Sequence, residues 1–199
     1  MRDRWLSVKS HAASPAELVE YARIPIAFES RTVMRVASAA NGAFVVSEEP
    51  ADPPIFKDYD ALPNEGPVNW ASRFDLSAWT LFMAWMNDVH VGGAALVFRS
   101  SDVELLERRD DVGLLWDIRV DPSRRRWGIG SALLDVVERT LIARGAHWLD
   151  AETQQINAPA CRFYARHGFQ LRRVAPNAYP SCPDEIQLLW RKPLLCERA

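Results

Sequence analysis

The chain has 199 residues, of which 48% are hydrophobic, and carries a formal net charge of −2 at pH 7. This length suffices to bury one full core, and a net-acidic chain lacks the basic excess typical of nucleic-acid-binding domains. No apolar run is long enough to cross a bilayer, and the N-terminus lacks the features of a signal peptide. We therefore expect one cytoplasmic domain over residues 1–199, with no nucleic-acid or membrane partner. The three cysteines and four histidines show no metal-ligand spacing, so no metal site is expected.

The first third of the chain predicts short elements around a long irregular segment. Ser14-Pro15-Ala16-Glu17 has the form of a capping box that opens a helix. Five prolines between Pro50 and Pro67 predict an irregular loop over residues 48–79. The other elements expected in this part are strands at residues 5–9, 31–36 and 42–46 and one helical turn at residues 69–74.

The remainder of the chain has more regular patterns. Residues 130–144 place apolar side chains on one face, as in an amphipathic helix, and Gly145 fits its C-terminal cap. Asn87-Asp88 indicates the turn of a hairpin, and Asn157 is a candidate N-cap for a short helix that ends before Gly168. Further strands are expected at residues 80–86, 89–98, 112–120, 147–153, 169–174 and 185–190.

The segment from Arg125 to Ser131 joins a predicted strand to the start of the long helix. Glycines at 128 and 130 allow a ligand to approach the backbone closely, and the free amides and dipole of a helix start favour an anion. Arg125 and Arg126 can add charge-assisted hydrogen bonds to phosphate oxygens. Two glycines at such a place also occur in plain tight turns. The segment matches neither a Walker loop nor a dinucleotide fingerprint.

Arg125-x-x-Gly128-x-Gly130 resembles the pyrophosphate loop of the GNAT superfamily of N-acetyltransferases. The run from Phe163 to Phe169, which contains Tyr164 and Gly168, is similar to the Tyr-x-x-x-Gly-Phe signature of that superfamily. The resemblance covers residues 80–192 well, whereas residues 1–79 form a divergent acceptor-side part. It implies an α/β fold with a mixed, mostly antiparallel central sheet that is splayed near its middle and has helices on both faces.

The resemblance also implies acetyl-coenzyme A as cofactor. The backbone of Ile118 and Val120 would pair with the pantetheine arm as an added strand does. The loop at Gly128 would face the pyrophosphate, and Asn157 would contact the cofactor arm as well as cap its helix. The positions assigned to cofactor binding are Ile118, Val120, Arg125, Arg126, Trp127, Gly128, Gly130, Ser131, Asn157 and Phe163.

The same resemblance makes Tyr164 the candidate general acid that protonates the departing thiolate, although a core aromatic is the alternative interpretation. Asp117 or Glu152 is the candidate base, and a water chain is the alternative. No cysteine or serine has a recognisable nucleophile setting, so direct attack by the amine is expected.

Residues 116–120, 152–157 and 184–190 are similar to streptothricin acetyltransferases, which acetylate an amine of a β-lysyl antibiotic. A small cationic amine is therefore the expected acceptor, and antibiotic resistance the implied role. Two alternative functions remain open, namely acetylation of a protein N-terminus or lysine, and a non-catalytic acetyl-coenzyme A-binding module. A homodimer also remains open.

Overall fold

A computed structural model describes residues 6–40 and 42–194. The chain divides into two compact units, each made of segments that alternate along the sequence. Unit 1 comprises residues 1–26, 58–149 and 194–199, and unit 2 comprises residues 27–57 and 150–193. Trp5, at the start of the first predicted strand, and Cys196 lie outside the described residues. Within the described part of the chain, no helix combines the length and apolar character needed to span a membrane.

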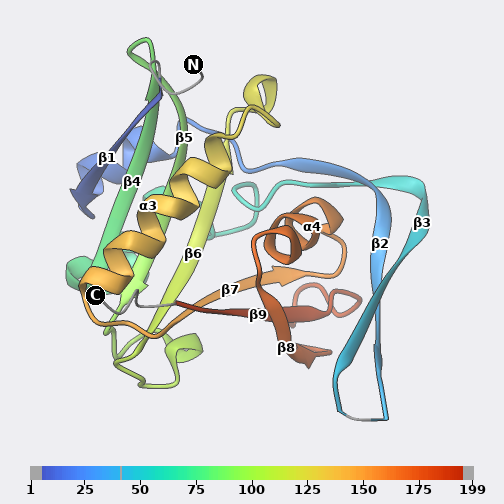
Figure 1. Cartoon of the computed structure of the whole chain (residues 1–199). Coiled ribbons are helices and arrows are strands. Elements are labelled where there is room, and N and C mark those ends of the chain that lie inside the picture. The colour runs from blue at the N-terminus through green and yellow to red at the C-terminus, as the bar shows by residue number, and fades with distance from the viewer. Residues whose placement is uncertain (1–5, 41, 195–199) are drawn as a thin grey trace. The chain divides into compact units, whose positions relative to one another are not determined.

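Unit 1 contains four strands in the order β1-β4-β5-β6, and each adjacent pair is antiparallel. Figure 1 shows these strands side by side. The predicted turn between β4 and β5 is confirmed, because Asn87 and Asp88 have φ angles of 49° and 61°, as a two-residue hairpin turn of type I′ requires. The strands are β1 (Leu6–Ala12), β4 (Trp79–Met86), β5 (Val89–Phe98) and β6 (Val112–Val120).

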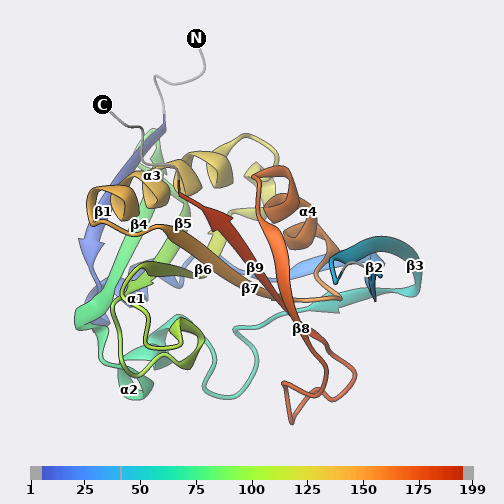
Figure 2. The same cartoon turned by 60° about the horizontal axis from the view of Figure 1, so that its bottom comes forward.

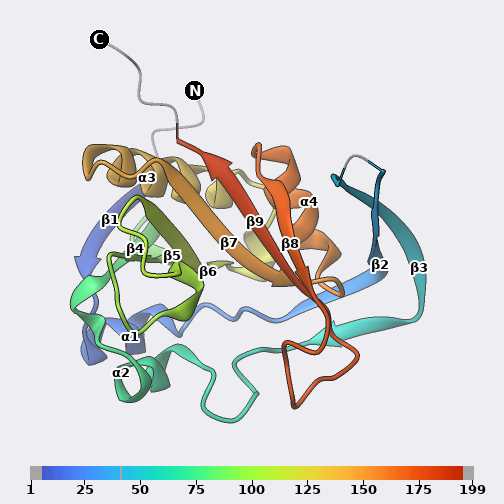
Figure 3. The ribbon, with the colours of Figure 1, turned by 90° about the horizontal axis from the view of Figure 1, so that it is seen from below.

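Two neighbouring glycines of β5 show how helices cover both faces of this sheet. A Cβ atom on Gly92 would lie 3.1 Å from the side chain of Ile129, and one on Gly93 would lie 2.5 Å from the ring of Tyr21. Successive strand residues point to opposite faces, so α3 (Ile129–Ala143) covers one face and α1 (Pro15–Tyr21) covers the other. Figure 3 shows α3 on one side and α1 with α2 (Trp70–Arg73) on the other. The prediction of helices on both faces is confirmed for unit 1.

The helix ends of unit 1 follow local sequence signals. Ser14 Oγ accepts a hydrogen bond from the Glu17 amide, so it caps α1 as predicted. The Glu17 carboxylate lies 3.3 Å from the ring of His11 instead of completing the capping box. Gly145 follows α3 with a φ of 81°, a conformation that glycine adopts without strain. The apolar face of α3 is fully buried at Leu133, Leu134, Val137 and Leu141.

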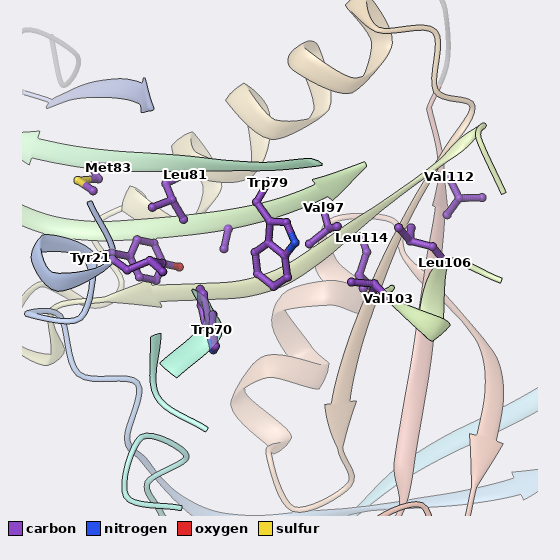
Figure 4. Close-up of a cluster of buried hydrophobic side chains, with 12 residues drawn as sticks. Tyr21, Trp70, Trp79, Leu81, Met83, Val97, Val103, Leu106, Val112 and Leu114 are labelled. Atoms are coloured by element: carbon purple, nitrogen blue, oxygen red, sulfur yellow. The ribbon is translucent and has the colours of Figure 1, made fainter. Parts of the chain in front are cut away.

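Aromatic residues fill the space between the sheet of unit 1 and its helices α1 and α2. Figure 4 shows Tyr21, Trp70 and Trp79 within this cluster. The ring centroids of Trp70 and Trp79 are 5.5 Å apart, and those of Trp79 and Trp116 are 5.1 Å apart. Rings at such distances contribute both buried area and favourable edge contacts. Trp70 thereby fixes the predicted helical turn at residues 69–74, which the structure confirms as α2.

Unit 2 contains three strands in the order β7-β9-β8, which lie side by side in Figure 2. Strand β7 (Trp148–Gln154) begins two residues before unit 2, and β8 (Gln170–Ala175) is antiparallel to β9 (Gln187–Pro193). Helix α4 (Ala158–Arg166) begins as predicted, because Asn157 Oδ1 accepts from the Ala160 amide at 3.1 Å. The α/β fold with a mostly antiparallel sheet is thus confirmed, whereas the splay near its middle stays a prediction.

A two-stranded ribbon of β2 (Phe28–Ser38) and β3 (Phe44–Lys57) completes unit 2 (Figure 1). The prediction that irregular structure starts at residue 48 is wrong, because β3 continues to Lys57. Its prolines are tolerated because, among the described strands, β3 pairs with β2 alone, and an edge strand can dispense with some backbone donors. The pairing also jumps from Ser30–Ile55 to Thr32–Pro50, so Pro53 and Pro54 fall in a bulge.

Candidate active site

The predicted pyrophosphate loop has an open backbone in unit 1. Gly128 has a φ of 87°, and a Cβ atom built on it would meet nothing within 4 Å. Gly128 is also the N-cap of α3, and no side chain among the described residues caps that helix start. The first amides of a helix have no partner within the helix, and its dipole favours negative charge there. The backbone at this position therefore suits a diphosphate.

The side chains around this loop differ in exposure. Trp127 is 63% exposed, and Arg126 is exposed with a φ of 70°. Arg125 is half-buried, and its Nε donates to the carbonyl oxygen of Val120 at 3.2 Å. This bond ties the loop to the end of β6, where Val120 pairs with Gly92 of β5. The open backbone and the two arginines fit the pyrophosphate of acetyl-coenzyme A.

Asp117 belongs to a buried cluster of charged and polar groups in unit 1. Its Oδ1 accepts from the Tyr21 hydroxyl at 2.5 Å and from Arg119 Nε at 2.9 Å, and its Oδ2 accepts from Arg119 Nη2 at 2.7 Å. Arg119 also donates to Asp60 Oδ2 at 2.8 Å and to the carbonyl oxygen of Ile24 at 3.0 Å. Asp117 is therefore held in a two-pronged ion pair rather than left available to a ligand.

Burial and charge act together in this cluster, which we call the Arg119 cluster (Tyr21, Ile24, Asp60, Asp117 and Arg119). Burial alone would lower the pKa of Arg119, but the Asp117 carboxylate raises it well above its usual range. Burial, followed by the charge of Asp117, raises the pKa of the Tyr21 hydroxyl. Arg119 thus stays charged and Tyr21 stays protonated. The cluster anchors the segment that follows residue 57, because Asp60 lies at the start of that segment.

Glu152 lies on β7 in unit 2 and is partly buried. Its Oε1 accepts a hydrogen bond from the hydroxyl of Tyr179, which lies between β8 and β9. The side-chain amide of Gln154 is more distant, at 3.5 Å from the same oxygen. The hydroxyl is a neutral donor, and its hydrogen bond orients the carboxylate. Tyr179 was not among the residues that the sequence indicated.

Tyr164 lies on α4 and is 5% exposed. Its ring centroid is 5.3 Å from that of Phe169 and 5.7 Å from that of Phe163, with Trp190 at 6.3 Å. These rings restrict the side chain to one direction, a property that both a core aromatic and a positioned acid require. Phe163 and Tyr164 share α4, and Asn157 caps that helix.

Each unit thus holds part of the predicted set. Unit 1 brings Asp117, Ile118 and Val120 together on β6, directly before the loop that contains Gly128. Unit 2 holds Glu152 on β7 together with Tyr164 on α4. The remaining members of the set are Arg125, Arg126, Trp127, Gly130 and Ser131 in unit 1 and Asn157 and Phe163 in unit 2.

The chain is similar to known acetyltransferases in sequence and in structure. The model of the acetyltransferase (GNAT) family matches residues 39–169. Streptothricin acetyltransferase A of Bacillus subtilis (strain 168) is 27% identical over 75% of this chain and 80% of that protein. Streptothricin acetyltransferase of Streptomyces lavendulae is 30% identical over 79% of each chain.

Two solved structures have the same fold. The crystal structure of nourseothricin acetyltransferase superimposes with a TM-score of 0.71 at 25% identity, over 94% of this chain and 99% of that chain. A structure from Bacillus anthracis str. Ames in complex with acetyl coenzyme A gives a TM-score of 0.72 at 18% identity, over 93% and 98% of the two chains. The family match, the shared fold and the open loop at Gly128 are consistent with one activity. The chain therefore belongs to the acetyltransferase (GNAT) family and is an acetyl-coenzyme A-dependent N-acetyltransferase.

Proposed function

We propose that this enzyme acetylates a primary amine of a small cationic acceptor of the streptothricin class. The observation that carries the proposal is the match to two streptothricin acetyltransferases. Each match spans at least 75% of the chain, which is more than residues 80–192 could account for. The similarity therefore extends into the acceptor-side part of the sequence, residues 1–79, and is not confined to the cofactor-binding part.

The proposed chemistry assigns one proton transfer to each of two residues of unit 2. Bound acetyl-coenzyme A supplies the thioester carbonyl that the amine nitrogen attacks directly. Glu152 takes the proton that the acceptor ammonium must lose before it can attack. Tyr164 gives its hydroxyl proton to the sulfur as the carbon–sulfur bond breaks. General acids and bases of this kind contribute roughly 10²- to 10⁴-fold each.

We propose Glu152 rather than Asp117 as the base because of their partners. An amine similar to that of lysine has a pKa near ~10 and arrives protonated at neutral pH. Both oxygens of Asp117 already accept from Arg119, so its charge is balanced locally. Glu152 accepts a hydrogen bond from the hydroxyl of Tyr179 and is only partly buried, whereas Asp117 is 8% exposed.

Carboxylates of the segment that follows residue 57 are weaker candidates for binding the acceptor. Asp60 is engaged by Arg119 at 2.8 Å, and Glu65 is 2.9 Å from Arg73. A carboxylate that already has an arginine partner gains little from a second cation, because the first one offsets its charge. Asp60 and Glu65 are thus engaged by arginines, and we assign Glu152 to the incoming ammonium.

An acceptor panel tests the proposal. Thiol release from acetyl-coenzyme A is measured with streptothricin, with a neutral hydroxyl analogue of its lysyl amine, and with peptides that present a free N-terminus or a lysine. We expect streptothricin to have a kcat/KM at least about tenfold above every other acceptor. A peptide used as well as streptothricin, or no turnover of streptothricin, contradicts the proposed acceptor class.

A further inference from the structure

Tyr179 differs from its neighbours in the segment between β8 and β9. Pro176, Asn177, Ala178 and Pro180 are exposed, whereas Tyr179 is partly buried. Figure 2 shows this segment extending beyond the ends of β8 and β9. The tyrosine hydroxyl donates to Oε1 of Glu152, which lies 27 residues earlier in the chain. An exposed, proline-containing turn thus delivers one aromatic side chain to a carboxylate on a neighbouring strand of unit 2.

The direction of the hydrogen bond follows from the chemistry of its two groups. An ionised carboxylate can only accept, whereas a phenolic hydroxyl has one proton to give. The hydroxyl of Tyr179 therefore donates its single proton to Glu152. Burial, and next the charge of Glu152, raises the pKa of Tyr179 well above its ordinary value, so the hydroxyl stays protonated at neutral pH.

The segment that presents Tyr179 is held at its far end by two side chains. Gln155 donates to the carbonyl oxygen of Asp184 at 2.8 Å and accepts from the Ile186 amide at 2.6 Å. Lys57 Nζ lies 2.5 Å from Glu185 Oε1 in a largely buried ion pair. Backbone bonds from Cys182 to Tyr179 and from Glu185 to Cys182 connect this anchor to the tyrosine. The position of the hydroxyl is therefore set by fixed elements of unit 2 and not by a free loop.

We propose that Tyr179 is a positioning residue for acetyl transfer, whose hydroxyl holds the Glu152 carboxylate in the orientation that receives the acceptor's proton. This inference rests on the proposed function of Glu152 and adds a residue to it. A hydrogen bond to a carboxylate stabilises the ionised form. Tyr179 thus orients the Glu152 carboxylate, while Tyr164 donates the proton that the leaving sulfur takes.

The test is the Tyr179→Phe variant, which keeps the ring and removes only the hydroxyl. We expect kcat to fall roughly tenfold, with the KM for acetyl-coenzyme A unchanged. The acidic limb of the kcat/KM profile for a cationic acceptor should move to higher pH by about one unit, because the carboxylate loses a charge-stabilising bond. Tyr59→Phe removes the hydroxyl of a partly buried tyrosine of unit 1 and should leave the acidic limb where it is.

A second arm places Tyr179→Phe in the Glu152→Gln background. If Tyr179 acts through Glu152, the added substitution causes no further loss there. The positioning role is overturned if the losses caused by Tyr179→Phe and Glu152→Gln multiply in the double variant. It is also overturned if the acidic limb of Tyr179→Phe does not move. Wild-type activity in Glu152→Gln alone is a different outcome, because it removes the proposed base and with it the basis for Tyr179. Thermal midpoints with and without acetyl-coenzyme A verify that every variant is folded and binds the cofactor.

Discussion

The carboxylates of Asp117 in unit 1 and Glu152 in unit 2 are held in contrasting ways. Asp117 is 8% exposed and receives two hydrogen bonds from the buried guanidinium of Arg119. Glu152 is partly buried and receives the hydroxyl of Tyr179. One carboxylate thus accepts from a permanent cation, and the other accepts from a neutral hydroxyl. The difference lies in the partner and not in the residue type or in its place on a strand.

This contrast bears on what each carboxylate can do. A buried ion pair is costly to break, because removal of one partner leaves an uncompensated charge. A carboxylate in such a pair is therefore suited to holding structure together, as the link from Asp117 through Arg119 to Asp60 does. We assign the contrasting role, attraction of the cationic acceptor, to the carboxylate that a hydroxyl holds. We therefore expect changes to the two residues to affect different properties of the enzyme.

The largest effect is expected from Glu152→Gln. The amide keeps the shape of the side chain but cannot accept the proton of the ammonium, so kcat/KM for the acceptor should fall roughly 10³-fold. Steady-state thiol release measures this loss. Glu48→Gln provides the matched control, since Glu48 lies on the ribbon of unit 2, where it pairs with Arg162 at 2.7 Å, and it should retain activity. Comparable kinetics in the two variants would contradict the assigned base.

The next largest effect is expected from Tyr164→Phe, which removes the proposed acid. Turnover should fall roughly 10²-fold, and the affinity for acetyl-coenzyme A should change little because only a hydroxyl is lost. The aromatic contacts with Phe169 and Trp190 remain, so the thermal midpoint should change little as well. The readouts are kcat from steady-state kinetics and the affinity for acetyl-coenzyme A from a cofactor titration. Full turnover in this variant would assign proton delivery to another group.

Asp117→Asn should instead act mainly on stability. The substitution leaves the charge of Arg119 less balanced in a buried place, at a cost of roughly 3 kcal/mol and a fall in thermal midpoint of roughly 6–12 °C. The catalytic constants of the folded protein should stay within about threefold of wild type, as expected of a structural pair. Calorimetry and kinetics on the same sample separate the two properties. A large catalytic loss with unchanged stability would reverse the contrast.

Gly128→Val should abolish the rise in thermal midpoint that acetyl-coenzyme A causes. At a hundredfold excess over Kd, that rise corresponds to about 2.7 kcal/mol, and a side chain at this open backbone position would block the pyrophosphate. Gly42 is a matched control, because it has a φ of 80° and the same open surroundings but lies between β2 and β3 in unit 2. Gly42→Val carries the same backbone strain and should keep the cofactor shift. Equal shifts in both variants would contradict the assigned loop.

Local signals in the sequence predicted much of the fold. The apolar face of α3, the Asn87-Asp88 turn and the Asn157 cap are each specified by a few neighbouring residues. The course of β3 through its prolines was not predictable in this way, because it depends on β2 being the one described strand that pairs with it. Prolines in a sequence argue against a strand, but the sequence does not reveal whether that strand will lie at an edge, where proline is tolerated.

The candidate site was predicted in part. The glycines of the loop and Tyr164 belong to short motifs, whereas the hydroxyl partners of the two carboxylates come from distant segments. Tyr21 reaches Asp117 across 96 residues, and Tyr179 comes from a turn with no periodic pattern. Asp117 and Arg119 are two residues apart on one strand and so share a face. That spacing was the available signal that Asp117 has a cation as its neighbour.

The most direct test of the contrast compares the two carboxylates in one experiment. The quantity measured is the ratio of kcat/KM for streptothricin to kcat/KM for the neutral analogue, in wild type, Glu152→Gln and Asp117→Asn. We expect Glu152→Gln to lose most of the preference for the cation, by about tenfold or more, and Asp117→Asn to retain it. Retention of the preference in Glu152→Gln, or its loss in Asp117→Asn alone, would contradict the assignment of Glu152 to the cationic acceptor.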